Sequence, residues 1–104
     1  MPLYAVTYAH PDEAGWRTHV MAHVAYLQDL LREGALRASG PFTGTPVKSA
    51  LLIISAPDRQ ALDALIARDP FAIHGLIADM TITEWDPIFG AFNAESSMPG
   101  KLQG

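Results

Sequence analysis

Cysteine is absent from this sequence of 104 residues. Disulfide bonds, thiolate nucleophiles and cysteine-based zinc sites are therefore excluded. Basic residues are few, with 7 lysines and arginines against 11 acidic residues and a formal net charge of −4. Because the basic residues are also scattered, the electrostatic footprint of a nucleic-acid-binding protein is missing. No apolar run approaches the roughly 20 residues that a membrane-spanning helix needs.

Charged residues of either sign make up only 17% of the chain, which is low for a small monomer and suggests a surface buried in an oligomer. The short apolar start, residues 1–6, lacks the basic region of a signal peptide, so a cytoplasmic protein is expected. A glycine-rich phosphate loop and a serine nucleophile elbow are also missing.

The patterns that are present predict four strands and two main helices. Residues 3–9, 35–39, 47–56 and 77–85 read as strands, since they are rich in apolar and β-branched side chains or alternate in polarity. Apolar residues at helical spacing over 16–31, with Gly34 as a C-cap, predict the first helix. The second helix begins after Asp58, and Asp69-Pro70 ends it and starts a further short helix.

The order strand, helix, strand, strand, helix, strand is that of a ferredoxin-like α+β sandwich. Such a domain has an antiparallel sheet with its helices on one face. The uncovered face must be buried elsewhere, which predicts a homodimer through the sheets, or a higher oligomer built from it. We expect the domain to cover residues 1–92, followed by a polar tail at 93–104.

The side chains with the strongest chemical potential are His23, within the first helix, and Asp69, in Asp69-Pro70-Phe71. A neutral imidazole beside a carboxylate is a standard general base near neutral pH. Each residue also has a structural interpretation. His23 lies at the edge of the apolar stripe and can be a core residue bonded to a backbone carbonyl, and Asp69 can be a helix N-cap. One carboxylate can fill both of its roles.

Several other residues are candidates for contacts with a small-molecule substrate. Tyr26 is one turn beyond His23, His74 follows the short helix, and Phe71 can form an apolar wall. Ser39 and Gly40 precede Pro41 at a strand end, where free backbone N–H groups suit an oxyanion. Packing, or for Ser39 and Gly40 a plain turn, is the alternative for each of them.

His19 and His23 are four residues apart on one helix face, a spacing that can bind zinc or copper. No third ligand is obvious, although His74 or Asp69 can be considered. We therefore expect neither a metal nor another cofactor.

Taken together, these motifs resemble the YCII-related family, small proteins of the dimeric α+β barrel group. The resemblance runs from Leu3 to about Phe89 and depends on the order and spacing of short motifs: His23 with Leu27, Leu30 and Gly34, then Gly40-Pro41, Asp69-Pro70-Phe71, Gly75 and Glu84-Trp85. It implies a ferredoxin-like protomer, a homodimer whose sheets face each other, and a catalytic His–Asp pair that maps onto His23 and Asp69. Some relatives carry an arginine three positions before the histidine. Val20 stands there in this chain, and the nearest arginine is Arg17.

Members of the wider group include muconolactone isomerases and an enzyme that removes chloride from a chlorinated hydroxyhydroquinone. The resemblance thus implies a small cofactor-independent enzyme, of isomerase, dehalogenating lyase or hydrolase type, acting on a cyclic or aromatic metabolite. The alternative is a non-catalytic dimeric module that binds a small molecule or has a structural role. The catalytic interpretation requires His23 and Asp69 to lie within hydrogen-bonding distance at a pocket.

Overall fold

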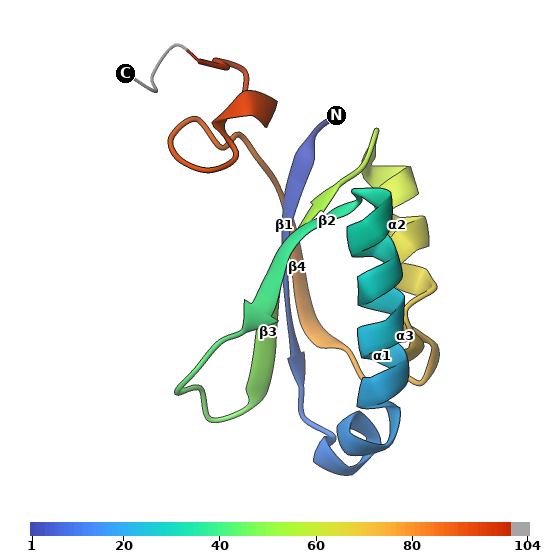
Figure 1. The fold of residues 1–104 in the computed structure, drawn as a ribbon. Coiled ribbons are helices and arrows are strands. Elements are labelled where there is room, and N and C mark those ends of the chain that lie inside the picture. Colours follow the sequence, from blue (N-terminus) through green and yellow to red (C-terminus); the bar gives the residue numbers. More distant parts are fainter. Residues whose placement is uncertain (101–104) are drawn as a thin grey trace.

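The computed structural model describes residues 1–100 and contains one four-stranded antiparallel sheet with its helices on one side (Figure 1). The strand order is β2-β3-β1-β4. This confirms the ferredoxin-like α+β fold. The elements are β1 (Leu3–His10), α1 (Glu13–Glu33), β2 (Leu36–Pro41), β3 (Lys48–Ser55), α2 (Arg59–Ala67), α3 (Pro70–Ile73), β4 (Ala78–Trp85) and a short 3-10 turn at Asn93–Glu95.

Local signals explain where the helices begin and end. The carboxylate of Asp12 accepts from the Gly15 N–H at 3.0 Å, and that of Asp58 accepts from the Ala61 N–H at 2.8 Å, so α1 and α2 each start on an aspartate N-cap. Helix α1 ends at Gly34, whose φ of 83° needs a residue without a Cβ. The Ala35 N–H then bonds to the Leu30 carbonyl at 3.0 Å, which completes a Schellman motif. The predicted caps at Asp58 and Gly34 are confirmed.

The core lies between the sheet and the helices. Alternate residues of β1, namely Tyr4, Val6 and Tyr8, point toward the helices and pair with Ile54, Leu52 and Ala50 of β3. Leu30 of α1 and Leu62 of α2 close this layer from the other side. The alternation leaves Ala5, Thr7, Leu51 and Ile53 on the opposite face of the sheet.

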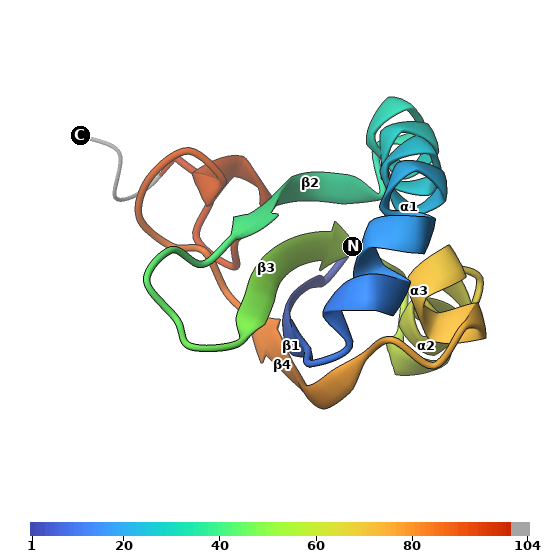
Figure 2. The ribbon, with the colours of Figure 1, turned by 90° about the horizontal axis from the view of Figure 1, so that it is seen from below.

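The C-terminal segment lies on the helix-free side of the sheet, at one end (Figures 1 and 2). Arg37 of β2 forms an ion pair with Glu95 and places its guanidinium over the ring of Phe92. Asn93 is buried and its side chain accepts from the Gly100 N–H at 2.7 Å. Residues 93–100 of the predicted polar tail therefore pack on this chain, and residues 101–104 lie outside the described part.

No helix within residues 1–100 is long and apolar enough to cross a membrane.

Candidate active site

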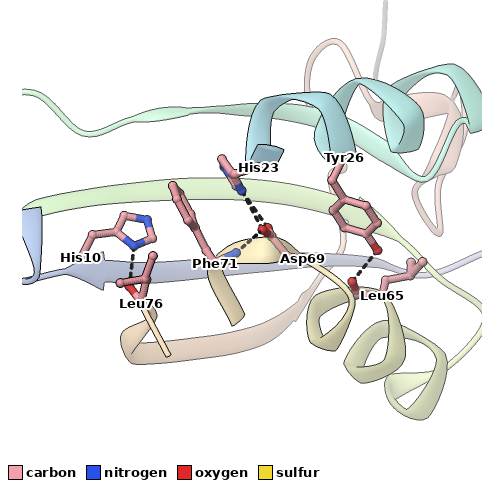
Figure 3. A network of polar contacts seen from close by, with 7 residues as sticks. All are labelled: His10, His23, Tyr26, Leu65, Asp69, Phe71 and Leu76. Atoms are coloured by element: carbon pink, nitrogen blue, oxygen red, sulfur yellow. Dashed lines mark hydrogen bonds and ion pairs between the residues drawn. The ribbon is translucent and has the colours of Figure 1, made fainter. Parts of the chain in front are cut away.

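The structure brings His23 and Asp69 into direct contact, although 46 residues separate them in the chain. The Nδ1 atom of His23 lies 2.9 Å from Oδ1 and 2.8 Å from Oδ2 of Asp69 (Figure 3). A carboxylate can only accept a hydrogen bond, so Nδ1 carries the proton and its N–H donates a hydrogen bond to Asp69. In a neutral imidazole of this tautomer, the other ring nitrogen, Nε2, carries a lone pair.

Asp69 is held in place by the start of α3. Its Oδ1 also accepts from the Phe71 N–H at 2.9 Å, so the residue is the N-cap of this short helix, with Pro70 in its first turn. The carboxylate is almost fully buried, with 5% of its side chain exposed, while His23 keeps 11%. The two predicted roles of Asp69, N-cap and histidine partner, therefore coexist in one carboxylate.

The His23 imidazole is also fixed by packing. It stacks on the ring of Phe71, with centroids 4.0 Å apart and planes 13° from parallel. Phe71 in turn lies against the imidazole of His10 at 4.7 Å and the indole of Trp16 at 6.5 Å. A buried aromatic thus holds one face of the imidazole while Asp69 sets its rotation and tautomer.

A pocket of about 410 Å³ opens beside His23, between α1, the start of β3 and the end of β2. That volume suits a small ring compound. Its apolar walls are Trp16, Val20, Leu27, Pro41, Phe42, Ala50 and Phe71. Its polar lining comes from Tyr8, His10, His23, Ser39, Gly40, Lys48 and Ser49.

Two further residues with polar groups, Tyr8 and His10 of β1, line this pocket. The hydroxyl of Tyr8 is buried and has no hydrogen-bond partner among the described residues. Burial, with a smaller effect from the Asp69 charge, raises the pKa of Tyr8, so the hydroxyl stays protonated and can donate. An unpaired buried hydroxyl costs about 1–3 kcal/mol.

His10 is buried, and its Nδ1 donates to the Leu76 carbonyl at 2.8 Å (Figure 3). Burial lowers the pKa of His10 below its ordinary value of 6.5, and the bond to Leu76 offsets only part of this effect. His10 is therefore a neutral imidazole near pH 7, with Nε2 unprotonated.

We expect His10 to make the protein less stable in mild acid. Because the folded-state pKa lies below 6.5, the unfolded chain binds more protons as the pH falls, and stability declines from about pH 6.5 downward. His10→Asn keeps a donor for Leu76 but removes the titration, so its free energy of unfolding should change less between about pH 7.5 and 5.5. Urea denaturation at several pH values measures this. His74→Asn, at an exposed site, is the control, and an unchanged slope in His10→Asn would contradict the prediction.

The predicted substrate-contact residues divide into two groups. Ser39, Gly40 and Phe71 line the pocket. Tyr26 does not, because its hydroxyl is turned away from His23 and donates to the Leu65 carbonyl of α2 at 2.6 Å (Figure 3). His74 is exposed outside the pocket and stacks on His19, with ring centroids 3.7 Å apart.

His19 and His23 therefore have different neighbours. Within residues 1–100, no group of three or more His, Cys, Asp or Glu side chains is placed to hold a metal ion.

Sequence reasoning missed Tyr8, His10 and Lys48 as pocket residues. The signal was available in part: Tyr8 and His10 are two apart on a strand and so share a face. Lys48 needs the register of the sheet, since it pairs with His10 across the β1–β3 ladder.

Comparison with known proteins gives the family. A model of the YCII-related domain matches residues 1–86. The chain belongs to the YCII-related family. This confirms the resemblance in the sequence, and the matched region includes both His23 and Asp69. No curated protein matches this YCII-related chain.

Solved structures of similar fold include dimeric α+β barrel proteins. One is the 5-chloro-2-hydroxyhydroquinone dehydrochlorinase of Burkholderia phenoliruptrix AC1100, in complex with 2,5-dihydroxybenzoquinone. It is 24% identical over 81% of this chain and 93% of its own, with a TM-score of 0.68. A second is muconolactone isomerase, at 16% identity over 98% of this chain and 96% of its own, with a TM-score of 0.66. A dimeric ferredoxin-like protein from Jannaschia sp. CCS1 is 18% identical over 83% of this chain and 99% of its own, with a TM-score of 0.51. At these identities the likeness is one of fold.

Proposed function

We propose that this YCII-related protein is a small cofactor-independent enzyme that uses His23 and Asp69 for general acid–base chemistry on a cyclic or aromatic metabolite. The observation that carries the proposal is the His23–Asp69 contact of 2.8 Å at the edge of a pocket of about 410 Å³. His23 supplies the reacting nitrogen, and Asp69 orients the ring from behind.

The proton movements follow from this arrangement. Nε2 of His23 accepts a proton from an acidic C–H or O–H of the substrate, while Nδ1–H stays bonded to Asp69. The buried carboxylate stabilises the imidazolium that forms. The imidazolium then returns its proton to a different substrate atom, which is an isomerisation, or keeps it while a leaving group departs with its electron pair, which is an elimination.

Two of the related folds support this choice of chemistry. One is an isomerase of muconolactone, and the other is a dehydrochlorinase of 5-chloro-2-hydroxyhydroquinone. Both reactions need a base and an acid at one place, and neither requires a change of oxidation state supplied from outside. A non-catalytic binding module would need the same pocket, but it would not need a carboxylate such as Asp69 to orient the imidazole of His23.

Solvent deuterium exchange tests the proposal directly. The protein is incubated in D₂O with muconolactone and 5-chloro-2-hydroxyhydroquinone, and then with related lactones and phenols. The ring C–H signals and the release of chloride are measured over time. We expect the protein to accelerate exchange, isomerisation or chloride loss for at least one ring compound. If the unmodified protein accelerated these reactions no more than His23→Gln does, a catalytic role for the His23–Asp69 pair would be contradicted.

We also propose that the protein is a homodimer through the helix-free face of the sheet. This face carries Leu51 and Ile53 with small or hydroxylated neighbours, and a hollow of about 320 Å³ lies over it, lined by Ala38, Ser39, Gly40, Pro41, Phe42, Leu51 and Ile53. The lining of this hollow carries no charged residue, which suits burial against a second copy. The Jannaschia protein of similar fold is itself dimeric.

Light scattering at micromolar concentration should therefore give twice the mass of one chain. Leu51→Glu places a charge in the middle of this face and should yield monomers, since burying an unpaired carboxylate is costly. Gln28→Glu adds the same charge on an exposed position of α1 and is the control. A single-chain mass for the unmodified protein would overturn the dimer.

A further inference from the structure

A single lysine contributes to the pocket, and its environment points to the kind of substrate that the site accepts. Lys48 is the first residue of β3 and lines the pocket while being exposed to solvent, so it lies at the pocket mouth. It pairs with His10 across the sheet, and paired residues project to the same face. The ammonium group and the buried imidazoles therefore face one cavity.

The Lys48 side chain is held in place by an aromatic ring. Its Nζ atom lies 4.6 Å from the centroid of the Trp16 indole, within the range of a cation–π contact. A free lysine has a flexible stem with several rotatable bonds. Packing on the indole limits that freedom, so that an incoming anion meets an ammonium group that is already positioned.

No carboxylate of residues 1–100 forms an ion pair with Lys48. Within residues 1–100, the ion pairs join His23, Arg32, Arg37 and Arg59 to carboxylates, and none involves Lys48. No aspartate or glutamate from the described part of the chain lines the pocket. In a protein with a net charge of −4, the mouth of this cavity is a local positive region.

Aromatic rings connect Lys48 to the dyad. The indole of Trp16 lies against Phe71 at 6.5 Å, and Phe71 stacks on His23 at 4.0 Å. This continuous apolar wall runs from the ammonium group to the imidazole. A flat ring lying along it would present one end to His23 and the other to Lys48.

From this geometry we propose that Lys48, positioned on Trp16, is an anion-binding residue that makes the pocket selective for small ring compounds carrying a carboxylate or phenolate group. The inference rests on the proposed function, since it takes the pocket beside His23 as the substrate site. It assigns Lys48 to substrate selection and leaves proton transfer to His23.

Binding of two probes of the same shape tests the charge preference without any turnover. Benzoate and benzamide are titrated separately into the full chain, and amide chemical shifts of pocket residues are followed by NMR. We expect benzoate to bind about fivefold more tightly than benzamide, because a single partly exposed charge pair contributes an effect of this size. The preference should shrink as salt is added, since salt screens the pair.

Variants then locate the effect. Lys48→Met keeps the aliphatic stem and should bring the two affinities together, whereas Lys48→Arg should restore the preference. Trp16→Leu should weaken benzoate binding because the ammonium loses its support. Arg17→Met removes the positive charge of the residue that follows Trp16 in the chain and does not line the pocket, and it should leave the preference unchanged.

Several results would overturn the inference. The first is equal affinity of the unmodified protein for the two probes, and the second is a benzoate preference that survives in Lys48→Met. The third is the absence of benzoate-induced chemical-shift changes at pocket residues up to about 50 mM benzoate, a concentration that detects even millimolar binding. A change in the dimer mass of Lys48→Met without a change in probe affinity would instead assign Lys48 to the subunit contact. His23→Gln should keep the benzoate preference, so failure of the catalytic proposal remains distinguishable from failure of this one.

Discussion

We expect His23→Gln to lower turnover of the ring substrate by roughly 100-fold or more, which is the range that general acid–base catalysis contributes. Glutamine fills a similar volume beside Phe71 and can still donate to Asp69, so the fold is retained. It cannot accept and return a proton near neutral pH. Steady-state kinetics on folded protein, checked by circular dichroism, measures the effect.

Asp69→Asn should reduce turnover by a comparable factor, because an amide cannot stabilise the imidazolium or enforce the same tautomer. The double variant should fall well short of the product of the two single effects, since the two residues act as a unit. His74→Asn, an exposed histidine outside the pocket, should keep full activity. If His23→Gln retained normal turnover per folded molecule, His23 would be a structural residue and the catalytic proposal would fail.

Phe71→Ala should cost about 3–5 kcal/mol of unfolding free energy, the range for deleting a buried aromatic side chain. Phe71 is 1% exposed and supports three surrounding rings, those of His10, Trp16 and His23. The total free energy of unfolding of a domain of this size is roughly 5–15 kcal/mol, so this substitution would remove a large part of it. Urea unfolding monitored by circular dichroism gives the difference.

Phe71→Leu keeps most of the apolar volume and gives an intermediate loss, so the trend can be measured even if Phe71→Ala does not fold. Ile73→Ala lies two residues further along α3 and is the matched control. Ile73 is 65% exposed, and its substitution should change stability by no more than about 0.5 kcal/mol. A loss below about 1 kcal/mol in Phe71→Ala would mean that Phe71 does not support the site.

The element order could be predicted from the sequence because its signals are local. An aspartate accepts hydrogen bonds from N–H groups within the next few residues, as Asp58 and Asp69 do. A glycine at a left-handed position ends a helix, as Gly34 does. Only element boundaries shifted: β2 was expected at residues 35–39 and runs over Leu36–Pro41, since pairing with β3 extends it.

The site could be predicted only in part, because helix faces differ by small rotations. Val20, His23 and Leu27 follow at three- and four-residue steps and all line the pocket. Tyr26 is also three residues from His23, yet it faces α2 and bonds to Leu65. Spacing along α1 identifies neighbours on the helix surface, but the element packed against each part of that surface is a property of the whole fold.

By itself, then, the sequence determined which segments form strands and helices, where the helices are capped, and which family the chain resembles. Only the tertiary structure decided that Tyr8, His10 and Lys48 join His23 around one pocket, while His74 and Tyr26 stay outside it. The reason is physical. Caps and periodicity depend on contacts between residues that are a few positions apart in the chain. The pocket is formed by strand register and by the packing of α1 on α3, which bring together residues tens of positions apart in the chain. Those long-range contacts depend on how every buried side chain fits at once, and no local pattern records them.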